Sequence, residues 1–237
     1  MKFKKRFAII ASLLLLFIFA GCQNQNSAPK TLRLAETINS SDERIWYVCY
    51  TEENKDLKPD TEVGGVLVTK DAKITAYITA ASHKTLKDFN SKKSNDEQIS
   101  YAKKLSKKGS IGKDKKKSVI TKDSKVNLYM DMTGEKVAGE GINEITAPDY
   151  FMTRIVNKTK IGDFNYAGLK DPRINSGTGQ ASYYLVTRLD NDKQKFEFDK
   201  PDEKNTKKVY MKSYPKKKST SNKSSKSESK KDSRSGK

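Results

Sequence analysis

Histidine and cysteine are scarce in this chain of 237 residues, which contains one histidine and two cysteines. Structural zinc sites use four ligands that come mainly from these two residue types. A single histidine excludes a two-histidine metal site, and the chain has no cluster of cysteine and histidine. We therefore expect neither a metal ion nor another cofactor.

The sequence also lacks a complete catalytic motif. No Gly-x-Ser-x-Gly motif accompanies the single histidine, His83, so we expect it to be a surface or loop residue and not a general base. The Ser-x-x-Lys spacing of penicillin-recognising enzymes begins at Ser100, Ser110 and Ser213, but the companion motifs Ser-Asp-Asn and Lys-Thr-Gly are absent. We predict that the chain is not an enzyme and assign no catalytic residue.

Two polar stretches match ligand-binding loops only in part. Residues 175–179, Asn-Ser-Gly-Thr-Gly, lack the third glycine of a dinucleotide fingerprint and the Gly-Lys-Ser/Thr of a phosphate-binding loop. Asp190-Asn191-Asp192 begins like a calcium loop, but Gln194 and Lys195 follow where that loop needs a ligand and a glycine. We interpret both stretches as turns.

Positive charge is unevenly distributed in a chain whose formal net charge is +19. The net excess comes from three segments that carry +4, +8 and +7: residues 2–6, Lys103 to Lys125, and Lys216 to Lys237. The rest of the chain is formally neutral. Arginine, whose planar fork grips phosphate and reads guanine, supplies only 7 of the 48 basic residues. We expect diffuse, salt-sensitive attraction to a polyanion and no specific nucleic-acid recognition; the alternative is a solvated charge run that only keeps the protein soluble.

A short apolar run lies near the N-terminus. Residues 7–20 are apolar except for Ser12, and four basic residues precede them. A helix needs about 20 residues to cross the hydrocarbon core, so this run is typical of an export signal and not of a permanent span. It ends in Phe19-Ala20-Gly21-Cys22, which resembles the lipobox of bacterial lipoproteins.

This resemblance implies that residues 1–21 form a lipoprotein signal peptide and that Cys22 carries a diacylglyceryl group after cleavage. Two acyl chains, at about 0.8 kcal/mol per buried methylene, give stable anchorage. The mature protein would then be held at the extracellular face of the bacterial cell membrane without spanning it. An ordinary secretory signal with a chance cysteine is the alternative. With Cys22 lipidated, Cys49 is left single, and its large apolar neighbours predict a buried hydrophobe and not a nucleophile.

The remaining patterns predict an α+β fold with antiparallel β hairpins and one main helix from Ser94 to Lys108. The helix begins at a capping box formed by Ser94 and Glu97 and ends before Gly109, and a shorter helical turn is expected at residues 85–89. Alternating apolar residues and turn residues predict the strands. These lie at residues 44–50, 63–69, 73–79, 126–132, 137–145, 183–189, 196–198 and 208–214. Turns at residues 70–72, 133–136 and 190–192 are expected to join the strands on either side of them as hairpins.

We expect four regions along the chain: the signal peptide (1–21), the lipidated cysteine with a flexible tether (22–42), a globular domain (43–215) and a basic tail (216–237). The tail has no apolar residue in 22 positions, so we predict that it is disordered. Whether the globular domain is one unit or two subdomains split near residues 110–125 stays open.

Ile45-Trp46-Tyr47, the stretch from Val66 to Tyr77 and the helix at residues 94–108 resemble uncharacterised surface lipoproteins of lactobacilli and related Gram-positive bacteria. The resemblance implies an α+β domain and no particular activity. We expect a membrane-anchored extracellular binding or interaction module whose basic segments meet anionic lipid head groups or wall polymers. An envelope-associated hydrolase with an unrecognised site is the alternative, and a solute-binding component of a transporter is a third.

Overall fold

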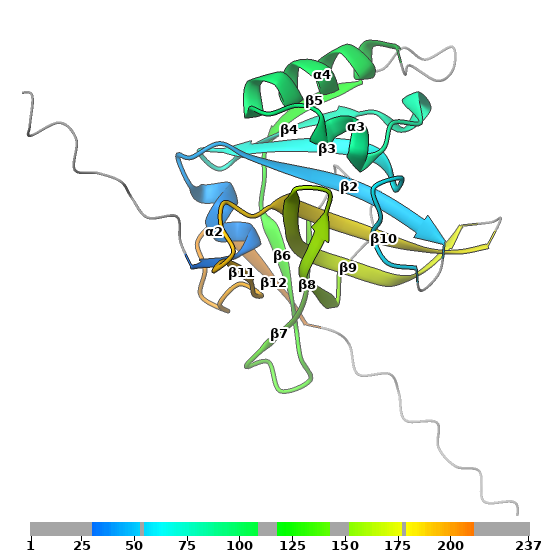
Figure 1. The fold of residues 1–237 in the computed structure, drawn as a ribbon. Coiled ribbons are helices and arrows are strands. Elements are labelled where there is room, and N and C mark those ends of the chain that lie inside the picture. The colour runs from blue at the N-terminus through cyan, green and yellow to red at the C-terminus, as the bar shows by residue number, and fades with distance from the viewer. Residues whose placement is uncertain (1–29, 53–54, 109–117, 143–151, 177–178, 211–237) are drawn as a thin grey trace, which may run out of the picture.

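The computed structural model describes residues 30–52, 55–108, 118–142, 152–176 and 179–210 (Figure 1). The predicted signal peptide, the lipobox with Cys22 and the basic tail (216–237) lie outside these residues. Within them the fold is α+β with a large antiparallel sheet, which confirms the fold class predicted from the sequence.

Seven strands form this sheet in the order β5-β4-β3-β2-β10-β9-β8, and every neighbouring pair is antiparallel. Their bounds are β2 Arg44–Glu52, β3 Glu62–Lys70, β4 Lys73–Ile78, β5 Val119–Asp123, β8 Arg154–Ile161, β9 Phe164–Ser176 and β10 Gly179–Arg188. β2 pairs with β3 on one side and with β10 on the other. Because strands from both halves of the chain share one sheet, the described residues do not divide into two subdomains near 110–125.

Helices and small sheets cover both faces of the large sheet (Figure 1). One face carries α3 (Leu86–Asn90) and α4 (Asn95–Lys108), with the short 3₁₀ helix η1 (Ala80–Ser82) beside them. The other face carries α2 (Leu34–Asn39) and two small sheets, β12-β6-β7 and β1-β11. The strands of these small sheets are β1 Thr31–Leu32, β6 Val126–Met130, β7 Val137–Ile142, β11 Lys195–Phe196 and β12 Thr206–Tyr210.

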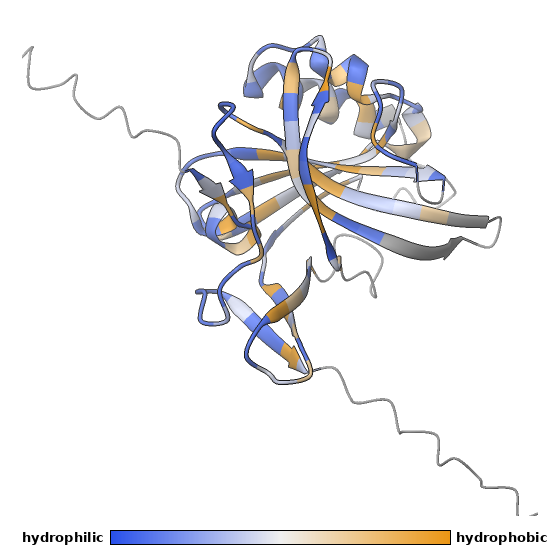
Figure 2. Ribbon diagram, turned by 60° about the horizontal axis from the view of Figure 1, so that its bottom comes forward, coloured by the Kyte–Doolittle hydropathy of each residue, from blue (hydrophilic) through white to orange (hydrophobic). Residues whose placement is uncertain are grey.

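β2 shows why both faces need cover, because its side chains alternate between two apolar cores. Trp46 belongs to the core on the α2 side, whereas Tyr47 and Cys49 belong to the core under α3 and α4. Figure 2 shows apolar residues concentrated in the strands and hydrophilic residues in the connecting loops. Cys49 is fully buried, which confirms the prediction of a buried hydrophobe, and burial raises the pKa of its thiol.

Local sequence signals place the helices of the α3/α4 layer. The Ser94 hydroxyl accepts a hydrogen bond from the Glu97 backbone N–H at 3.2 Å, and the Glu97 carboxylate accepts one from the Ser94 N–H at 3.3 Å. Thr85 and Asp88 form the equivalent capping box at α3. Ala102 and Leu105 bury the inner side of α4. The predicted main helix and the predicted shorter helical turn are therefore confirmed.

The predicted tether (22–42) is wrong from residue 30 onward, because β1 and α2 belong to the globular domain. Leu32, Leu34 and Ile38 are at most 1% exposed and pack against the large sheet and β6. Leu34 and Ile38 lie one helical turn apart, which is enough to form an apolar face on a helix of six residues. The partner of β1 is β11, which lies more than 160 residues later in the sequence.

The predicted hairpin between residues 183–189 and 196–198 is also wrong. β10 pairs with β2 and β9, and β11 turns away to run parallel to β1. Polar contacts fix the conformation of the connecting turn, because Asp190 pairs with Arg44 and the Gln194 side chain donates a hydrogen bond to Asp190. The hairpins β3–β4 and β6–β7 are confirmed.

Candidate functional site

The outer side of α4 is strongly polarised in charge. Its first turn carries the exposed acids Asp96 and Glu97, and its last two turns carry the exposed Lys103, Lys104 and Lys107. We call these three lysines the lysine face. No ion pair within the described residues involves them. Cations near a helix C-terminus are favoured by the helix dipole by about 0.3–1 kcal/mol each, so they also suit the helix itself.

The neighbours of the lysine face are largely neutralised. η1 contacts α4, and the two residues that follow η1 are His83 and Lys84. The His83 imidazole lies 3.2 Å from a Glu62 carboxylate oxygen, and the Lys84 ammonium lies 3.8 Å from that of Asp88. Unlike His83 and Lys84, the lysine face has no acidic partner within the described residues.

Around Glu62, three side chains form a surface cluster. The Tyr50 hydroxyl donates to a Glu62 oxygen at 2.7 Å, and this bond, with the bond from His83, holds the pKa of Glu62 below its usual value. The His83 side chain is 77% exposed, as expected for a surface histidine. Its neighbour Ser82 donates to the Thr79 carbonyl at 2.6 Å. The cluster thus pairs an exposed histidine with a carboxylate but brings no serine hydroxyl to the imidazole.

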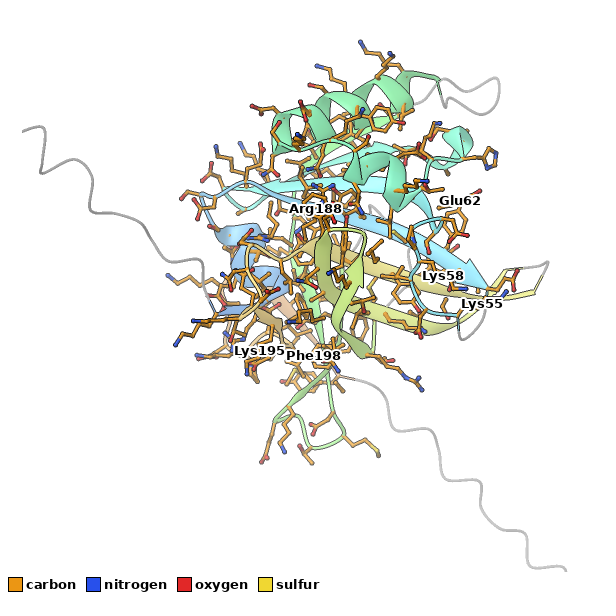
Figure 3. The ribbon with its side chains drawn as sticks, viewed as in Figure 1. Lys55, Lys58, Glu62, Arg188, Lys195 and Phe198 are labelled. Carbon is orange, nitrogen blue, oxygen red and sulfur yellow. The ribbon has the colours of Figure 1, made fainter. Side chains whose placement is uncertain are left out.

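Arg188 is the centre of a polar network that fixes α3 and the segment after it. Its guanidinium donates to the carbonyl oxygens of Phe89 at 2.8 Å and Lys92 at 3.2 Å. It also donates to the Asn90 side chain at 3.1 Å and to the Tyr166 hydroxyl at 3.2 Å. Figure 3 shows Arg188 beneath the α3/α4 layer. Since these bonds occupy the guanidinium, we assign Arg188 a structural role.

A small cleft of about 60 Å³ adjoins Arg188, between the start of β2 and the N-terminus of α4. Its wall includes Arg44, whose guanidinium pairs with Asp190 at 2.6 Å. Gln98 also lines it, and the buried Tyr47 hydroxyl donates to the Gln98 side chain. These four polar side chains of the cleft, Arg44, Asp190, Tyr47 and Gln98, are thus already paired with one another.

Two acids, Glu140 on β7 and Asp199 after β11, are buried beneath α2, with exposures of 0% and 3%. A Glu140 oxygen accepts a hydrogen bond from the Asp199 N–H, and the other oxygen has no partner within the described residues. Asp199 caps α2, because its carboxylate accepts from the N–H groups of Ala35 at 2.7 Å and Glu36 at 3.3 Å. Sequence reasoning missed this pair, which no local spacing could have indicated.

Burial raises the pKa of both carboxyls, to about 6 for Asp199 and well above its usual value for Glu140. The charge of Asp199 raises the pKa of Glu140 further, and Glu203 acts likewise on Asp199. The α2 N–H groups lower the pKa of Asp199, and Arg33 lowers that of Glu140. Folding therefore favours the protonated form of the pair.

The other motifs noted in the sequence form no candidate site within the described residues, or lie outside them. Asp192 accepts a hydrogen bond from the Asn165 side chain at 2.6 Å, as expected for a turn. Among the described residues, no three or more His, Cys, Asp and Glu side chains gather as a metal site would require. Ser100 lies exposed on α4, and Ser110, Ser213 and Cys22 fall outside the described residues.

Comparison with known proteins yields no match to a protein-family model, to a curated protein or to a solved structure. In the part of the chain that the structure describes, no helix combines the length and the apolar character needed to cross a bilayer.

Proposed function

We propose that this protein is a lipid-anchored extracellular lipoprotein that acts as a binding or interaction module at the bacterial cell envelope. The observation that carries the proposal is the sequence Phe19-Ala20-Gly21-Cys22 at the end of a short apolar run that follows basic residues. The resemblance to a lipobox explains how the chain would be exported and held. A diacylglyceryl group on Cys22 supplies two acyl chains, which is enough for stable anchorage.

The exposed cations of the folded domain support a role in binding. The lysine face has no acidic partner within the described residues, so it is free to attract an external anion. Lysine ammonium groups attract phosphate and carboxylate without fixed geometry, which suits a polymer and not a single small ligand. Attraction of this kind is screened over about 10 Å at 0.1 M salt.

The hydrolase alternative has no specific observation in its favour. An acid pair exists in Glu140 and Asp199, but both carboxyls are covered by protein and one of them caps α2. His83 is exposed but bonds to Glu62 and not to a hydroxyl nucleophile. We therefore keep the interaction module as the proposal.

The anchor is tested by fractionating cells that produce the Cys22→Ala variant. We expect this variant to leave the membrane fraction, or to keep its signal peptide, because the thiol that would be lipidated is missing. Cys49→Ala is the matched control, since Cys49 is buried in the core and should not affect anchoring. A Cys22→Ala variant that is processed and retained on membranes like the parent would contradict the proposal.

A further inference from the structure

The segment nearest the proposed anchor and the lysine face lie on opposite faces of the large sheet. α2 contacts β3 and β4 from one side, and α4 contacts the same two strands from the other. Lys30, at the start of β1, is next to β11, because its carbonyl accepts a hydrogen bond from the Lys195 N–H at 3.0 Å. Figure 3 shows Lys195 on the α2 side, away from α4. The chain therefore enters the domain on the face that α4 does not occupy.

The length of the connecting chain limits how the domain can turn. Eight residues, from Gln23 to Lys30, separate Cys22 from β1. The backbone takes nine Cα-to-Cα steps from Cys22 to Thr31, so even a fully extended connection spans at most about 32 Å. Two helix layers with a sheet between them are about 30 Å thick, since a helix is 10–12 Å wide and packed layers lie about 10 Å apart. To lay the lysine face on the bilayer, the connection would have to pass around this whole thickness, which takes almost its full extended length and the chain entropy that goes with it. With the α2 side toward the bilayer, no such extension is needed.

We infer that the lysine face is directed away from the membrane and binds a phosphate-bearing polymer of the envelope, not the lipid head groups. The inference rests on the proposed lipid anchor at Cys22 and decides between the two polyanions that the sequence leaves open. The buried Ala102 and Leu105 fix the rotation of α4 about its axis, so Lys103, Lys104 and Lys107 stay on its outer side. Cations that face away from the bilayer are too far from the lipid phosphates to bind them. They meet the phosphates of an envelope polymer instead.

The orientation is tested by energy transfer on lipidated protein held in vesicles whose head groups carry an acceptor dye. A donor dye is attached at Lys104→Cys in one variant and at Lys193→Cys in a second, which lies beside β11 on the anchor side. Cys49 is fully buried and its thiol pKa is raised, so it does not compete for the label. We expect the donor at position 193 to be quenched several times more strongly than the donor at position 104.

The ligand is tested with inorganic polyphosphate on the same anchored protein in uncharged vesicles. Replacing all three residues of the lysine face by glutamine should weaken polyphosphate binding about tenfold at low salt, because three phosphate contacts are lost. The matched control replaces Lys30, Lys193 and Lys195 by glutamine, and its polyphosphate binding should equal that of the parent. On vesicles that contain anionic phosphatidylglycerol, the lysine-face variant should associate as strongly as the parent does.

Equal quenching at positions 104 and 193 would overturn the inference, and so would unchanged polyphosphate binding by the lysine-face variant. A lysine-face variant that loses affinity for phosphatidylglycerol vesicles instead would assign the surface to lipid. None of these three results would contradict the proposed lipid anchor. A parent chain that does not associate with vesicles would contradict the anchor itself, and with it the inference, so the two failures are distinguishable.

Discussion

Glu140 and Asp199 show how a buried acid pair makes stability depend on pH. Both pKa values are raised in the folded chain by burial, whereas both carboxyls titrate near pH 4 in an unfolded chain. A raised acidic pKa means that folding favours the protonated form. The contribution of the pair to stability is therefore complete below about pH 4 and is lost as the pH rises through about 6 and above.

Glu140→Gln tests this account, because glutamine has the shape of a protonated glutamic acid and keeps an acceptor for the Asp199 N–H. We predict that the free energy of unfolding of the variant at pH 7.5 equals that of the parent or exceeds it by up to about 2 kcal/mol. The reason is that no charge has to be buried. Its stability should also fall less between pH 5 and 8. Urea unfolding at a series of pH values measures both effects.

Glu135→Gln provides the control, since Glu135 is exposed in the turn between β6 and β7. This variant should keep the pH profile of the parent. If Glu140→Gln is instead markedly less stable than the parent at pH 7.5, the fold requires the ionised carboxylate, and the account in which burial disfavours its charge is wrong.

α2 is an element that its surroundings stabilise, because six residues are too few for a stable isolated helix. Burial of Leu32, Leu34 and Ile38 contributes on the order of 6 kcal/mol, at about 1.5–3 kcal/mol for each side chain. Ionising the acid pair beneath α2 opposes this burial, because both carboxyls have raised pKa values in the folded chain.

Leu34→Ala tests whether α2 is part of the fold. Leu34 is fully buried, so we predict a loss of about 3 kcal/mol in the free energy of unfolding, measured with urea. Glu36→Ala is the control on the same helix, because Glu36 is exposed and its ion pair with Arg33 should be worth less than about 1 kcal/mol. Equal stabilities of the two variants would mean that this segment is a tether after all.

Elements held by neighbouring residues could be predicted from the sequence. The capping box at Ser94 and Glu97 marks α4, and the turn at Asp71 and Ala72, both with positive φ, closes the β3–β4 hairpin. These signals lie within a few residues of the structure that they specify. The predictions of β2 and of a buried Cys49 rested on the same kind of local pattern.

Elements held by distant partners were missed. β1 pairs with β11, and α2 takes its N-terminal cap from Asp199, so the cap of a helix near residue 34 is encoded more than 160 residues away. Half of the six residues of α2 are polar or charged, and only the fold supplies the surface that buries Leu34 and Ile38. The same holds for the candidate site. The lysines could be predicted from the sequence, but their lack of acidic partners within the described residues could not, because it depends on the fold.

The whole molecule separates the proposed anchor from the exposed cations. β3 and β4 are covered by α2 on one side and by α4 on the other. The segment nearest the proposed anchor and the lysine face therefore lie on opposite faces of the large sheet. A longer tether would erase this arrangement by letting the domain turn over. The docking of residues 31–39 therefore matters for function as well as for stability, because it shortens the connection to eight residues.

The most direct test of the central claim is the intact mass of the N-terminal peptide from protein isolated from its native membrane. We predict that the mature chain begins at Cys22, that residues 1–21 are absent, and that the peptide carries the mass of a diacylglyceryl group. An unmodified Cys22, or a chain that still holds its first 21 residues, would contradict the account.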